Sequence, residues 1–476
     1  MPSFLHSFLW KYLERSGSQA TQFIISIVLA RLLAPEDFGL IALVMVFIAL
    51  ANVFVQSGLK TALVQKKDAN DLDFSTVFWL SLTLAAVMYA LLFFAAPLIA
   101  NFYGNERLAP ITRVLGIILF FGALSSVQEA YIQKHFLFKK LFFRSLAVIV
   151  PSGIFGVSLA FYGLGIWALV WQQMANAFLT CVFMQFMVTW KPAFEFSIAR
   201  ATKLFNFGYK LLLSALLDTG YNNLANLLIG KFFTPATLGF YNRGEQFPKL
   251  IVANVNESIN AVLFPALANV QDDIEQFRQK MRKCVKISCF AIFPLMAILA
   301  SSATPTVEFV LGEKWLPCVI FLQISCFIFA LWPLHTTNLT AINSLGRSDI
   351  FLKLEIVKKI LGVSAIIIAL YFFKTPLAIV LSQAIISPIG VLINSFPNKK
   401  LLNYGFLEQA KDILQAFVFS LAAGFAVLPV SFLTIPNFAM IALQIVSGLS
   451  IYMLLAKIFR MESLDYFLEI LKRGSK

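Results

Sequence analysis

Residues 38–59 read FGLIALVMVFIALANVFVQSGL, an uncharged and mostly apolar run. A run of about 20 apolar residues is long enough for one helical crossing of the hydrocarbon core of a bilayer. The short polar turn Pro35-Glu-Asp37 precedes this run, and a second apolar run, 16–33, lies before the turn. Runs of this kind recur from one end of the 476 residues to the other, and they predict an all-α, polytopic membrane protein.

The composition supports the same fold class. Hydrophobic residues make up 59% of the chain and charged residues 13%, whereas a soluble domain has roughly 25% charged residues. The mean hydropathy is +0.81 over the whole chain, which is too high for a soluble protein with a single anchor. The sequence shows no polar stretch long enough to fold as a separate soluble domain.

Fourteen membrane crossings are predicted, with boundaries uncertain by about 2–4 residues. The eighth is the most polar of them and is rich in Asn and charged residues. The predicted crossings are 16–33, 38–59, 74–100, 108–130, 145–162, 165–189, 208–232, 238–262, 284–302, 317–340, 352–373, 375–396, 413–430 and 434–457.

The net charge of +14 is best explained by topology. Lys and Arg collect in alternate connections, such as 131–144 and 263–283, and loops rich in Lys and Arg stay in the cytoplasm. This pattern places both termini in the cytoplasm, and the bacterial inner membrane is the expected location. Because the positive charge is accounted for in this way, we predict no nucleic-acid partner.

The sequence contains an internal repeat. Arg31-Leu-Leu-Ala-Pro35-Glu-Asp-Phe-Gly39 aligns with Lys231-Phe-Phe-Thr-Pro235-Ala-Thr-Leu-Gly239 at a shift of 200 residues. Each repeat holds six predicted crossings, an even number, so the two copies enter the membrane in the same sense. We therefore predict a six-helix lobe over 1–200, a second six-helix lobe over 201–400, and an extra helical hairpin with a cytoplasmic tail over 401–476. Duplicated bundles that rock against each other are typical of transporters.

Polar residues within the predicted crossings mark candidate sites, because polar groups in hydrocarbon usually face a cavity or a partner helix. In the seventh crossing Asp218, Asn222 and Asn226 are spaced four apart, and their repeat partners in the first crossing include Gln22. Hydrogen bonding between helices is the alternative interpretation of these stripes. The eighth crossing and its partner, the second, carry further candidates: Arg243, Glu245, Gln246, Lys249 and Asn256, and Gln56 and Lys60.

Two further candidates are cations at the opposite ends of their helices from the Lys-rich loops. Arg31 and Lys231 are repeat partners, and each follows a predicted crossing where cations are otherwise scarce. They fit either a phosphate contact or a simple anchor at the membrane interface. Lys60 has a similar alternative, since a cation near an inner loop also sets topology.

No enzyme motif is recognised in the sequence. The five Cys residues form no CxxC pair, and the three His residues have no metal ligand at a suitable spacing, so no metal site or cofactor is predicted. A Gly-rich phosphate loop is also lacking, so ATP cannot drive transport from this chain alone. These observations favour a transporter over an enzyme.

The repeat motif and its surroundings resemble a known family. Residues 30–40, together with Gly58 and Val64-Gln-Lys-Lys67, are similar to the opening of polysaccharide flippases of the multidrug/oligosaccharidyl-lipid/polysaccharide exporter superfamily. Leu263-Phe-Pro-Ala-Leu-Ala268 and Leu311-Gly-Glu-Lys-Trp315 resemble the colanic-acid exporter (Wzx-type) branch. The similarity covers about residues 10–400. It implies a two-lobed bundle around a cationic cavity, and export of an undecaprenyl-pyrophosphate-linked repeat unit to the periplasmic leaflet, with a cation gradient as driver.

With that resemblance, the candidate residues receive hypothetical roles. Lys249 and Arg243 are expected to bind the pyrophosphate, and Asp218 or Glu245 a coupling cation. The lipid-linked oligosaccharide and membrane lipids are the expected partners, together with a polysaccharide polymerase and other assembly proteins. Three alternatives stay open: a cation-coupled drug or metabolite antiporter of the same superfamily, a membrane-embedded polysaccharide polymerase or ligase, and a lipid-binding scaffold.

Overall fold

The computed structural model describes residues 4–56, 58–66, 68–135 and 137–467. Within these ranges the chain forms helices joined by turns, and no strand occurs. The all-α fold class predicted from the sequence is thus confirmed. Two parts of the sequence predictions lie outside the described residues. They are the cytoplasmic tail beyond residue 467, and Lys67 of the motif Val64-Gln-Lys-Lys67.

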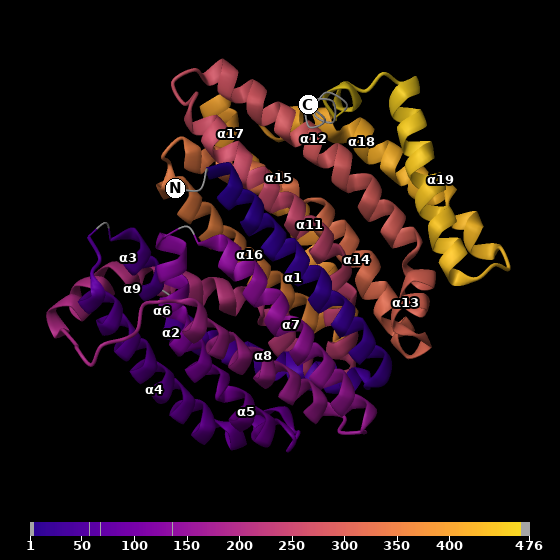
Figure 1. The fold of residues 1–476 in the computed structure, drawn as a ribbon. Coiled ribbons are helices and arrows are strands. Elements are labelled where there is room, and N and C mark those ends of the chain that lie inside the picture. Colours follow the sequence, from indigo (N-terminus) through magenta and orange to yellow (C-terminus); the bar gives the residue numbers. More distant parts are fainter. Residues whose placement is uncertain (1–3, 57, 67, 136, 468–476) are drawn as a thin grey trace. The chain divides into compact units, whose positions relative to one another are not determined.

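The chain divides into two compact units, Met1–Gly239 (unit 1) and Phe240–Lys476 (unit 2). In unit 1, α1 packs on α7, α7 packs on α8, and α4 packs on α5 and α6 (Figure 1). The helices of unit 1 are α1 (Phe4–Leu32), α2 (Pro35–Gln56), α3 (Leu59–Gln65), α4 (Asp71–Tyr103), α5 (Leu108–Gly116), α6 (Ile118–Lys134), α7 (Phe138–Phe161), α8 (Ile166–Met187), α9 (Ile198–Asn222) and α10 (Leu224–Phe232).

Helix α11 (Pro235–Ala268) begins in unit 1 and continues into unit 2. Within unit 2, α12 packs on α18, and α16 packs on α17. The remaining helices are α12 (Ile274–Ser301), α13 (Ala303–Leu311), η1 (Glu313–Cys318), α14 (Val319–Ala330), α15 (Trp332–Ser344), α16 (Ser348–Phe373), α17 (Pro376–Leu402), α18 (Phe406–Ala426), η2 (Leu428–Phe432) and α19 (Asn437–Ile458). The predicted division into lobes 1–200 and 201–400 with a hairpin stays a prediction.

Eleven helical segments in the described part of the chain are long and apolar enough to cross a membrane. Each coincides with one of the predicted crossings. The other three predicted crossings, the first, seventh and eighth, correspond to α1, to α9 with α10, and to α11. Each of these three carries a polar stripe in the sequence, as the second crossing also does. The total of fourteen crossings stays a prediction.

Several predicted crossings contain breaks that hydropathy does not reveal. The fourth divides into α5 and α6 at Ile117, the seventh into α9 and α10 at Asn223, and the tenth into α14 and α15 at Leu331. At Asn223 the side-chain amide donates to the carbonyl of Thr219, at 2.9 Å. An Asn side chain that bonds to the backbone competes with helical hydrogen bonding and favours such a break. Asp218 and Asn222 therefore lie on α9, while Asn226 lies on α10.

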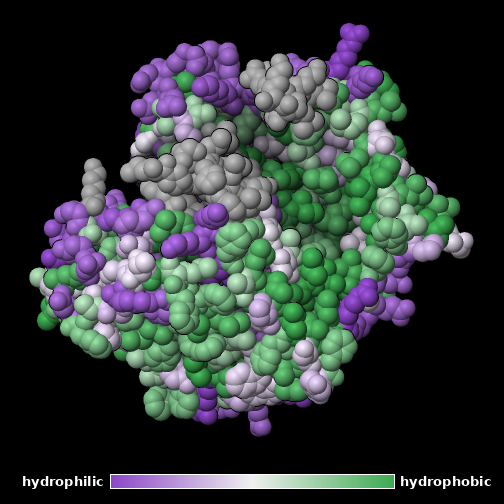
Figure 2. Space-filling view, in the orientation of Figure 1, coloured by the Kyte–Doolittle hydropathy of each residue, from purple (hydrophilic) through white to green (hydrophobic). Residues whose placement is uncertain are grey.

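The sides of the helices expose large hydrophobic residues. Phe94 and Leu98 of α4 are 75% and 70% exposed, and Phe186 of α8 is 85% exposed. Figure 2 shows hydrophobic residues over the sides of the helices, with hydrophilic residues gathered at the ends near α3 and near α17. Exposed apolar surface on this scale would not be stable in water, but it suits contact with lipid tails.

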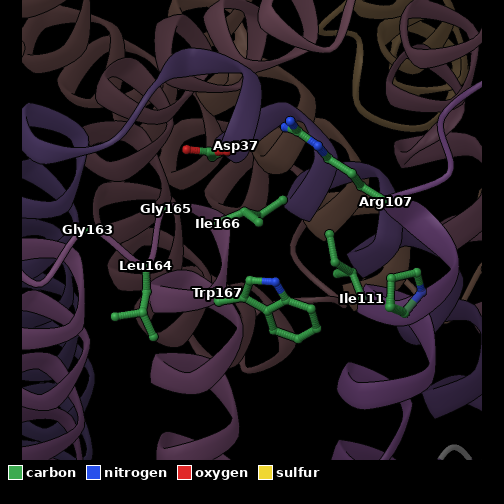
Figure 3. A pocket seen from close by; sticks show the side chains of 9 residues that line it. Asp37, Arg107, Ile111, Gly163, Leu164, Gly165, Ile166 and Trp167 are labelled. Atoms are coloured by element: carbon green, nitrogen blue, oxygen red, sulfur yellow. The ribbon is translucent and has the colours of Figure 1, made fainter.

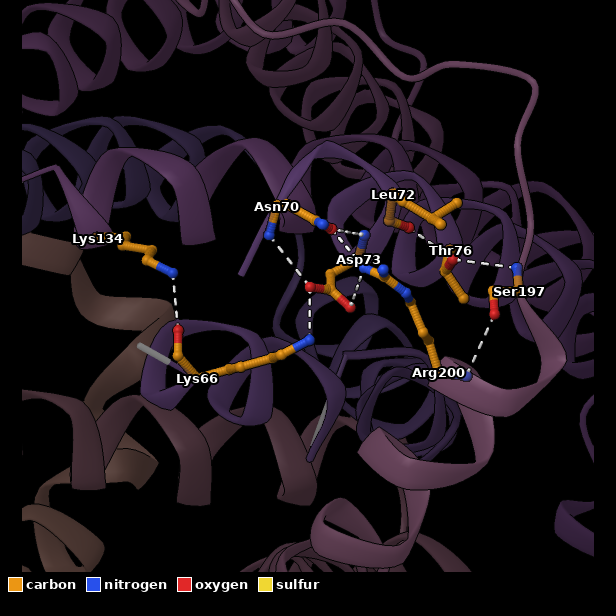
Figure 4. Close-up of polar contacts among 8 residues, drawn as sticks. All are labelled: Lys66, Asn70, Leu72, Asp73, Thr76, Lys134, Ser197 and Arg200. Atoms are coloured by element: carbon orange, nitrogen blue, oxygen red, sulfur yellow. Dashed lines mark hydrogen bonds and ion pairs between the residues drawn. The ribbon is translucent and has the colours of Figure 1, made fainter. Parts of the chain in front are cut away.

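A polar network fixes the start of α4. The carboxylate of Asp73 is fully buried and accepts from Lys66 Nζ at 2.6 Å, while Arg200 Nη1 lies 3.1 Å from it. Asn70 and Asp73 also form a capping box, in which each side chain accepts from the other residue's backbone N–H (Figure 4). Thr76 accepts from the backbone N–H of Ser197. These bonds hold the connection between α8 and α9 against the first turns of α4.

The two copies of the repeated motif meet in unit 1. A Cβ added to Gly39 would overlap the backbone carbonyl oxygen of Pro235, and one added to Gly239 would overlap that of Pro35. The contact is therefore reciprocal: the first turn of α2 crosses the first turn of α11 at equivalent positions of the repeat. Small residues allow helix backbones in membranes to approach this closely.

Candidate functional site

The most concentrated group of charges within the apolar helices of unit 1 centres on Glu129 of α6. Lys60 Nζ lies 2.7 Å from Glu129 Oε2, and Arg144 Nη1 of α7 lies 3.0 Å from Glu129 Oε1. The three side chains are 23%, 28% and 12% exposed, in the order Lys60, Glu129 and Arg144. We call them the Glu129 cluster. Two cations share one carboxylate, so the cluster carries a net charge of +1.

Two members of the cluster, Glu129 and Arg144, lie inside their helices and not at the ends. Glu129 lies five residues before the end of α6, and Arg144 lies six residues after the start of α7. At 1.5 Å per residue, both are about 8–9 Å inside their helices. Charged side chains within apolar helices are costly unless they are paired, and they usually line a pathway.

A glycine contact sets the orientation of Lys60. Gly58 precedes α3 with φ of 80°, in the left-handed region that favours glycine. A Cβ on Gly58 would lie 2.5 Å from the carbonyl oxygen of Gly208, so the chain passes directly over α9 at this point. The turn ends α2 at Gln56 and starts α3, which brings Lys60 to α6.

Uncharged polar residues extend the cluster along α2 and α6. Gln56 Nε2 donates to Asn52 Oδ1 at 2.8 Å, next to Gly122 of α6. Gln128 is fully buried, and neither polar atom of its side-chain amide has a hydrogen-bond partner among the described residues. A buried amide with unused donors and acceptors is unusual and commonly pairs with water or a ligand. The side chain of Gln128 is therefore a further candidate for binding, next in sequence to Glu129.

In unit 2 the candidate residues lie along α11. Lys249 is 55% exposed and pairs with Glu245 at 2.9 Å. Arg243 is buried; its Nη1 donates to Gln246 Oε1 at 2.6 Å, and its guanidinium lies 5.8 Å from the ring centre of Trp315. An exposed ammonium can accept a new partner at little cost, whereas a buried guanidinium must first leave its own contacts. Lys249 is thus the more accessible of the two predicted phosphate ligands.

A hollow of about 660 Å³ opens beside α11 and is lined by polar and apolar side chains in equal number. Thr340 Oγ1 of α15 donates to Asn260 Oδ1 of α11 at 2.6 Å across it. One turn before Asn260, Asn256 is buried, and its side-chain amide has no hydrogen-bond partner among the described residues. The hollow is lined by Asn260, Phe264, Pro265, Thr336, Leu339, Thr340, Asn343 and Phe351. Its mixed chemistry suits a ligand with hydroxyl groups and an apolar part.

The remaining polar residues of the predicted stripes lie on α1, α9 and α10. Gln22, Asp218 and Asn222 are exposed on α1 and α9. Asn226 donates to Asn223 Oδ1 at 3.3 Å, which is contact within the helical segment.

The paired cations of the repeat motif lie at the ends of α1 and α10. Arg31 and Lys231 are both exposed there. Lys231 Nζ donates to the carbonyl of Phe102 and lies 4.0 Å from the centre of that ring. A contact of Lys231 with a backbone carbonyl and an aromatic ring is typical of a cation that anchors a helix end. The proposed phosphate contact of Arg31 and Lys231 stays a prediction.

Sequence reasoning missed part of each group. In the sequence, Glu129 lies near the end of a predicted crossing and Arg144 lies in a Lys-rich connection, but that both Lys60 and Arg144 pair with Glu129 depends on tertiary structure. The polar side of α15, with Thr336, Thr340 and Asn343, was not singled out either. Its spacing of three to four residues was the available signal.

These features together define a multi-pass helical membrane protein with polar groups buried inside its bundle, the architecture of a transporter. The chain belongs to the family described as "Polysaccharide biosynthesis protein", whose family model matches residues 28–320. The resemblance stated from the sequence is thus confirmed.

Curated relatives agree with this family. The chain is 27% identical to the lipopolysaccharide biosynthesis protein WzxC of Escherichia coli (strain K12), over 72% of this chain and 70% of the relative. It is 26% identical to the teichuronic acid biosynthesis protein TuaB of Bacillus subtilis (strain 168), over 85% of each.

Solved structures confirm the polytopic fold. The lipid II flippase MurJ in an inward closed conformation superposes with a TM-score of 0.77 at 16% identity, over 95% of this chain and 98% of that one. A multidrug resistance MATE family transporter of the MOP superfamily has a TM-score of 0.62 at 14% identity, over 80% and 95% of the two chains. Identities this low show a shared fold alone.

Proposed function

We propose that this protein is a flippase that moves an undecaprenyl-pyrophosphate-linked polysaccharide repeat unit from the cytoplasmic to the periplasmic leaflet. The observation that carries the proposal is the net positive Glu129 cluster inside the helices of a member of a polysaccharide biosynthesis family. WzxC, TuaB and the flippase MurJ, by their names, act in related processes.

The chemistry of the substrate matches these groups. A pyrophosphate and a chain of sugars cannot cross hydrocarbon unaided at a useful rate, because both would lose their hydration. Lys and Arg supply charge-assisted hydrogen bonds to phosphate oxygens. The amides of Gln128 and Asn256, with their unused hydrogen-bonding capacity, supply donors and acceptors for hydroxyls. The lipid tail stays in the bilayer while the predicted lobes alternate between an inward and an outward opening.

The orientation of the chain in the membrane is inferred from the distribution of charge, whereas the direction of transport follows from the family resemblance. Lys66, Lys134 and Arg200 lie together at the start of α4, the end that the positive-inside rule assigns to the cytoplasm (Figure 4). We infer an inner-membrane location with both termini in the cytoplasm. In this proposal the protein transports and does not catalyse, and it hands its product to a polymerase and other assembly proteins.

A second candidate function is cation-coupled export of a drug or metabolite. It is favoured by the fold shared with the MATE transporter and by the carboxylate of Glu245, which is 21% exposed on α11. A coupling cation at Glu245 would compete with Lys249 for the same oxygen atoms. Sensitivity of a deletion strain to cationic dyes would support this alternative.

The proposed function is tested in a deletion strain. Surface polysaccharide is quantified, and lipid-linked repeat units are assigned to a leaflet by their accessibility to an added glycosidase. We expect the surface polymer to be lost, with repeat units retained on the cytoplasmic face. Normal polymer without retained units would argue against flipping, provided that no second flippase is present. Single units reaching the periplasm without elongation would indicate a polymerase instead.

Replacement of Lys249 by alanine tests the α11 face. A lost charged hydrogen bond costs about 1.5–3 kcal/mol, so we expect export to fall roughly tenfold or more. Lys249→Arg keeps the charge and should retain partial export. Lys457→Ala, at an exposed lysine on α19, is the matched control. Protein amount in the membrane is measured for each variant, and normal export by Lys249→Ala at normal abundance would remove this residue from the site.

A further inference from the structure

Unit 1 contains a pocket, away from the Glu129 cluster, that the proposed function does not use. It has a volume of about 320 Å³ and lies between the first turn of α2, the start of α5, and the α7–α8 turn with the first residues of α8. We call it the Trp167 pocket. It is lined by Asp37, Arg107, Pro110, Ile111, Gly163, Leu164, Gly165, Ile166 and Trp167.

Helix α4 connects the two ends of unit 1. It begins with the Asp73 network and ends at Tyr103, four residues before Arg107. Its 33 residues span about 50 Å at 1.5 Å each. The Trp167 pocket is therefore at the opposite end of α4 from the cluster of cations formed by Lys66, Lys134 and Arg200. If that cluster faces the cytoplasm, as proposed above, the pocket opens towards the periplasm.

The pocket combines an aromatic floor with two opposite charges. Figure 3 shows the Trp167 indole on one side and the side chains of Asp37 and Arg107 on the other, with Ile111 and Ile166 between them. Arg107 is 64% exposed and lies 3.8 Å from Glu36, a pair that is too exposed and too long to hold the guanidinium firmly. Its donors are available to a ligand.

The turn between α7 and α8 keeps the pocket open. Gly163 and Gly165 have φ of 80° and 55°, in the left-handed region, and a Cβ on either would meet no atom within 4 Å. Glycine adopts this conformation without strain. The rim of the pocket is therefore backbone without side chains at two of three consecutive positions, which leaves the Trp167 ring accessible.

This chemistry selects the class of ligand. The two charged lining residues cancel each other, so the pocket does not favour a pyrophosphate, which needs excess positive charge. A sugar ring has an apolar face of C–H groups, which packs on an indole, and hydroxyl groups, which bond to a carboxylate and a guanidinium together. A volume of about 320 Å³ lies at the lower end of the range for small-ligand sites, which suits one or two sugar rings.

We infer that the Trp167 pocket is a saccharide-binding subsite at the exit side of the protein. Trp167 stacks on a sugar ring of the repeat unit, while Asp37 and Arg107 bond to its hydroxyls. The subsite holds the sugar head after translocation, before the lipid-linked unit leaves. This inference rests on the proposed function for its place in transport, but the binding itself does not require transport.

The test measures binding to the purified full chain in lipid nanodiscs. The probe is a set of oligosaccharides released by mild acid from the surface polysaccharide of the source strain, and saturation-transfer NMR and calorimetry report binding. We expect wild type and Trp167→Phe to bind, and Trp167→Ala and Arg107→Ala to lose about tenfold or more in affinity, because the first change removes the aromatic face on which the sugar ring packs and the second removes a charge-assisted hydrogen bond. Trp171→Ala, one turn further along α8 and outside the pocket lining, is the matched control.

Each outcome decides one question. Equal binding by wild type and Trp167→Ala overturns the subsite, as does binding of inorganic pyrophosphate that depends on Arg107 and not on Trp167. Oligosaccharide binding that requires Trp167, in a protein whose deletion leaves the surface polymer intact, would keep the subsite and refute the flippase. Loss of polymer in the deletion strain, together with no effect of Trp167→Ala on oligosaccharide binding, would keep the flippase and refute the subsite.

Discussion

Lys60→Gln is expected to reduce export of surface polysaccharide strongly, and a second change, Glu129→Gln, is expected to restore part of it. With Lys60 present, two cations share the Glu129 carboxylate and one positive charge remains for a phosphate. Without Lys60, Arg144 and Glu129 form a neutral pair. Removing the carboxylate as well frees Arg144 and returns the net charge to +1. A charged hydrogen bond is worth about 1.5–3 kcal/mol, so the single variant should lose roughly tenfold to a hundredfold in export rate.

The double variant separates a binding role from a structural one. If Lys60 only stabilised the fold through its ion pair with Glu129, the second change, Glu129→Gln, would not restore export. Recovery in the double variant therefore indicates that the net charge of the cluster matters. Lys203→Gln, at an exposed cation on α9 of the same unit, is the matched control and should export normally. Lipid-linked units and surface polymer are quantified at equal protein abundance. Full export by Lys60→Gln, or no recovery in the double variant, would contradict an anion-binding role for the Glu129 cluster.

Much of the helical architecture could be predicted from hydropathy. The run 352–373, for example, corresponds to α16 over Ser348–Phe373. Breaks in the helices, such as the one at Asn223, could not be predicted from hydropathy, because a short interruption changes the mean hydropathy of a crossing very little. They depend instead on local hydrogen bonds, such as that from Asn223 to Thr219.

The sequence indicated some of the residues of the candidate site, but it did not indicate which residues they contact. Lys60 was singled out for its place in the polar stripe of the second crossing, yet its contact with Glu129 joins residues 69 positions apart. No periodicity carries information over that distance. The Trp167 pocket is similar: Asp37 lies at the start of α2, Arg107 in the turn before α5 and Trp167 at the start of α8, and no sequence pattern links the three. The repeat is an intermediate case. The alignment of Gly39 with Gly239 predicts that they occupy equivalent positions in the two repeats, but their close contact is visible only in the structure.

Gly39→Ala is expected to destabilise the protein and to reduce export with it. In most helices this change would stabilise, because glycine loses more conformational freedom on folding, by about 0.5–1 kcal/mol. Here the new Cβ would overlap the carbonyl oxygen of Pro235. Overpacking typically costs about 1–3 kcal/mol, and more where the obstructing atom cannot move aside. Since that atom belongs to the backbone of α11, we expect the upper part of this range, measured as a lower melting temperature in detergent.

A glycine without neighbours supplies the comparison. Gly220 of α9 is also in a helix of unit 1, and a Cβ there would meet no atom within 4 Å. Gly220→Ala should therefore leave the melting temperature unchanged or raise it. Gly239→Ala should behave like Gly39→Ala, because the contact is reciprocal and its Cβ would overlap the carbonyl oxygen of Pro35. If Gly39→Ala and Gly239→Ala both melt and export like wild type, the close crossing of α2 and α11 is not required. If both fail while Gly220→Ala is normal, the duplicated motif is retained in both halves because each copy is the surface on which the other packs.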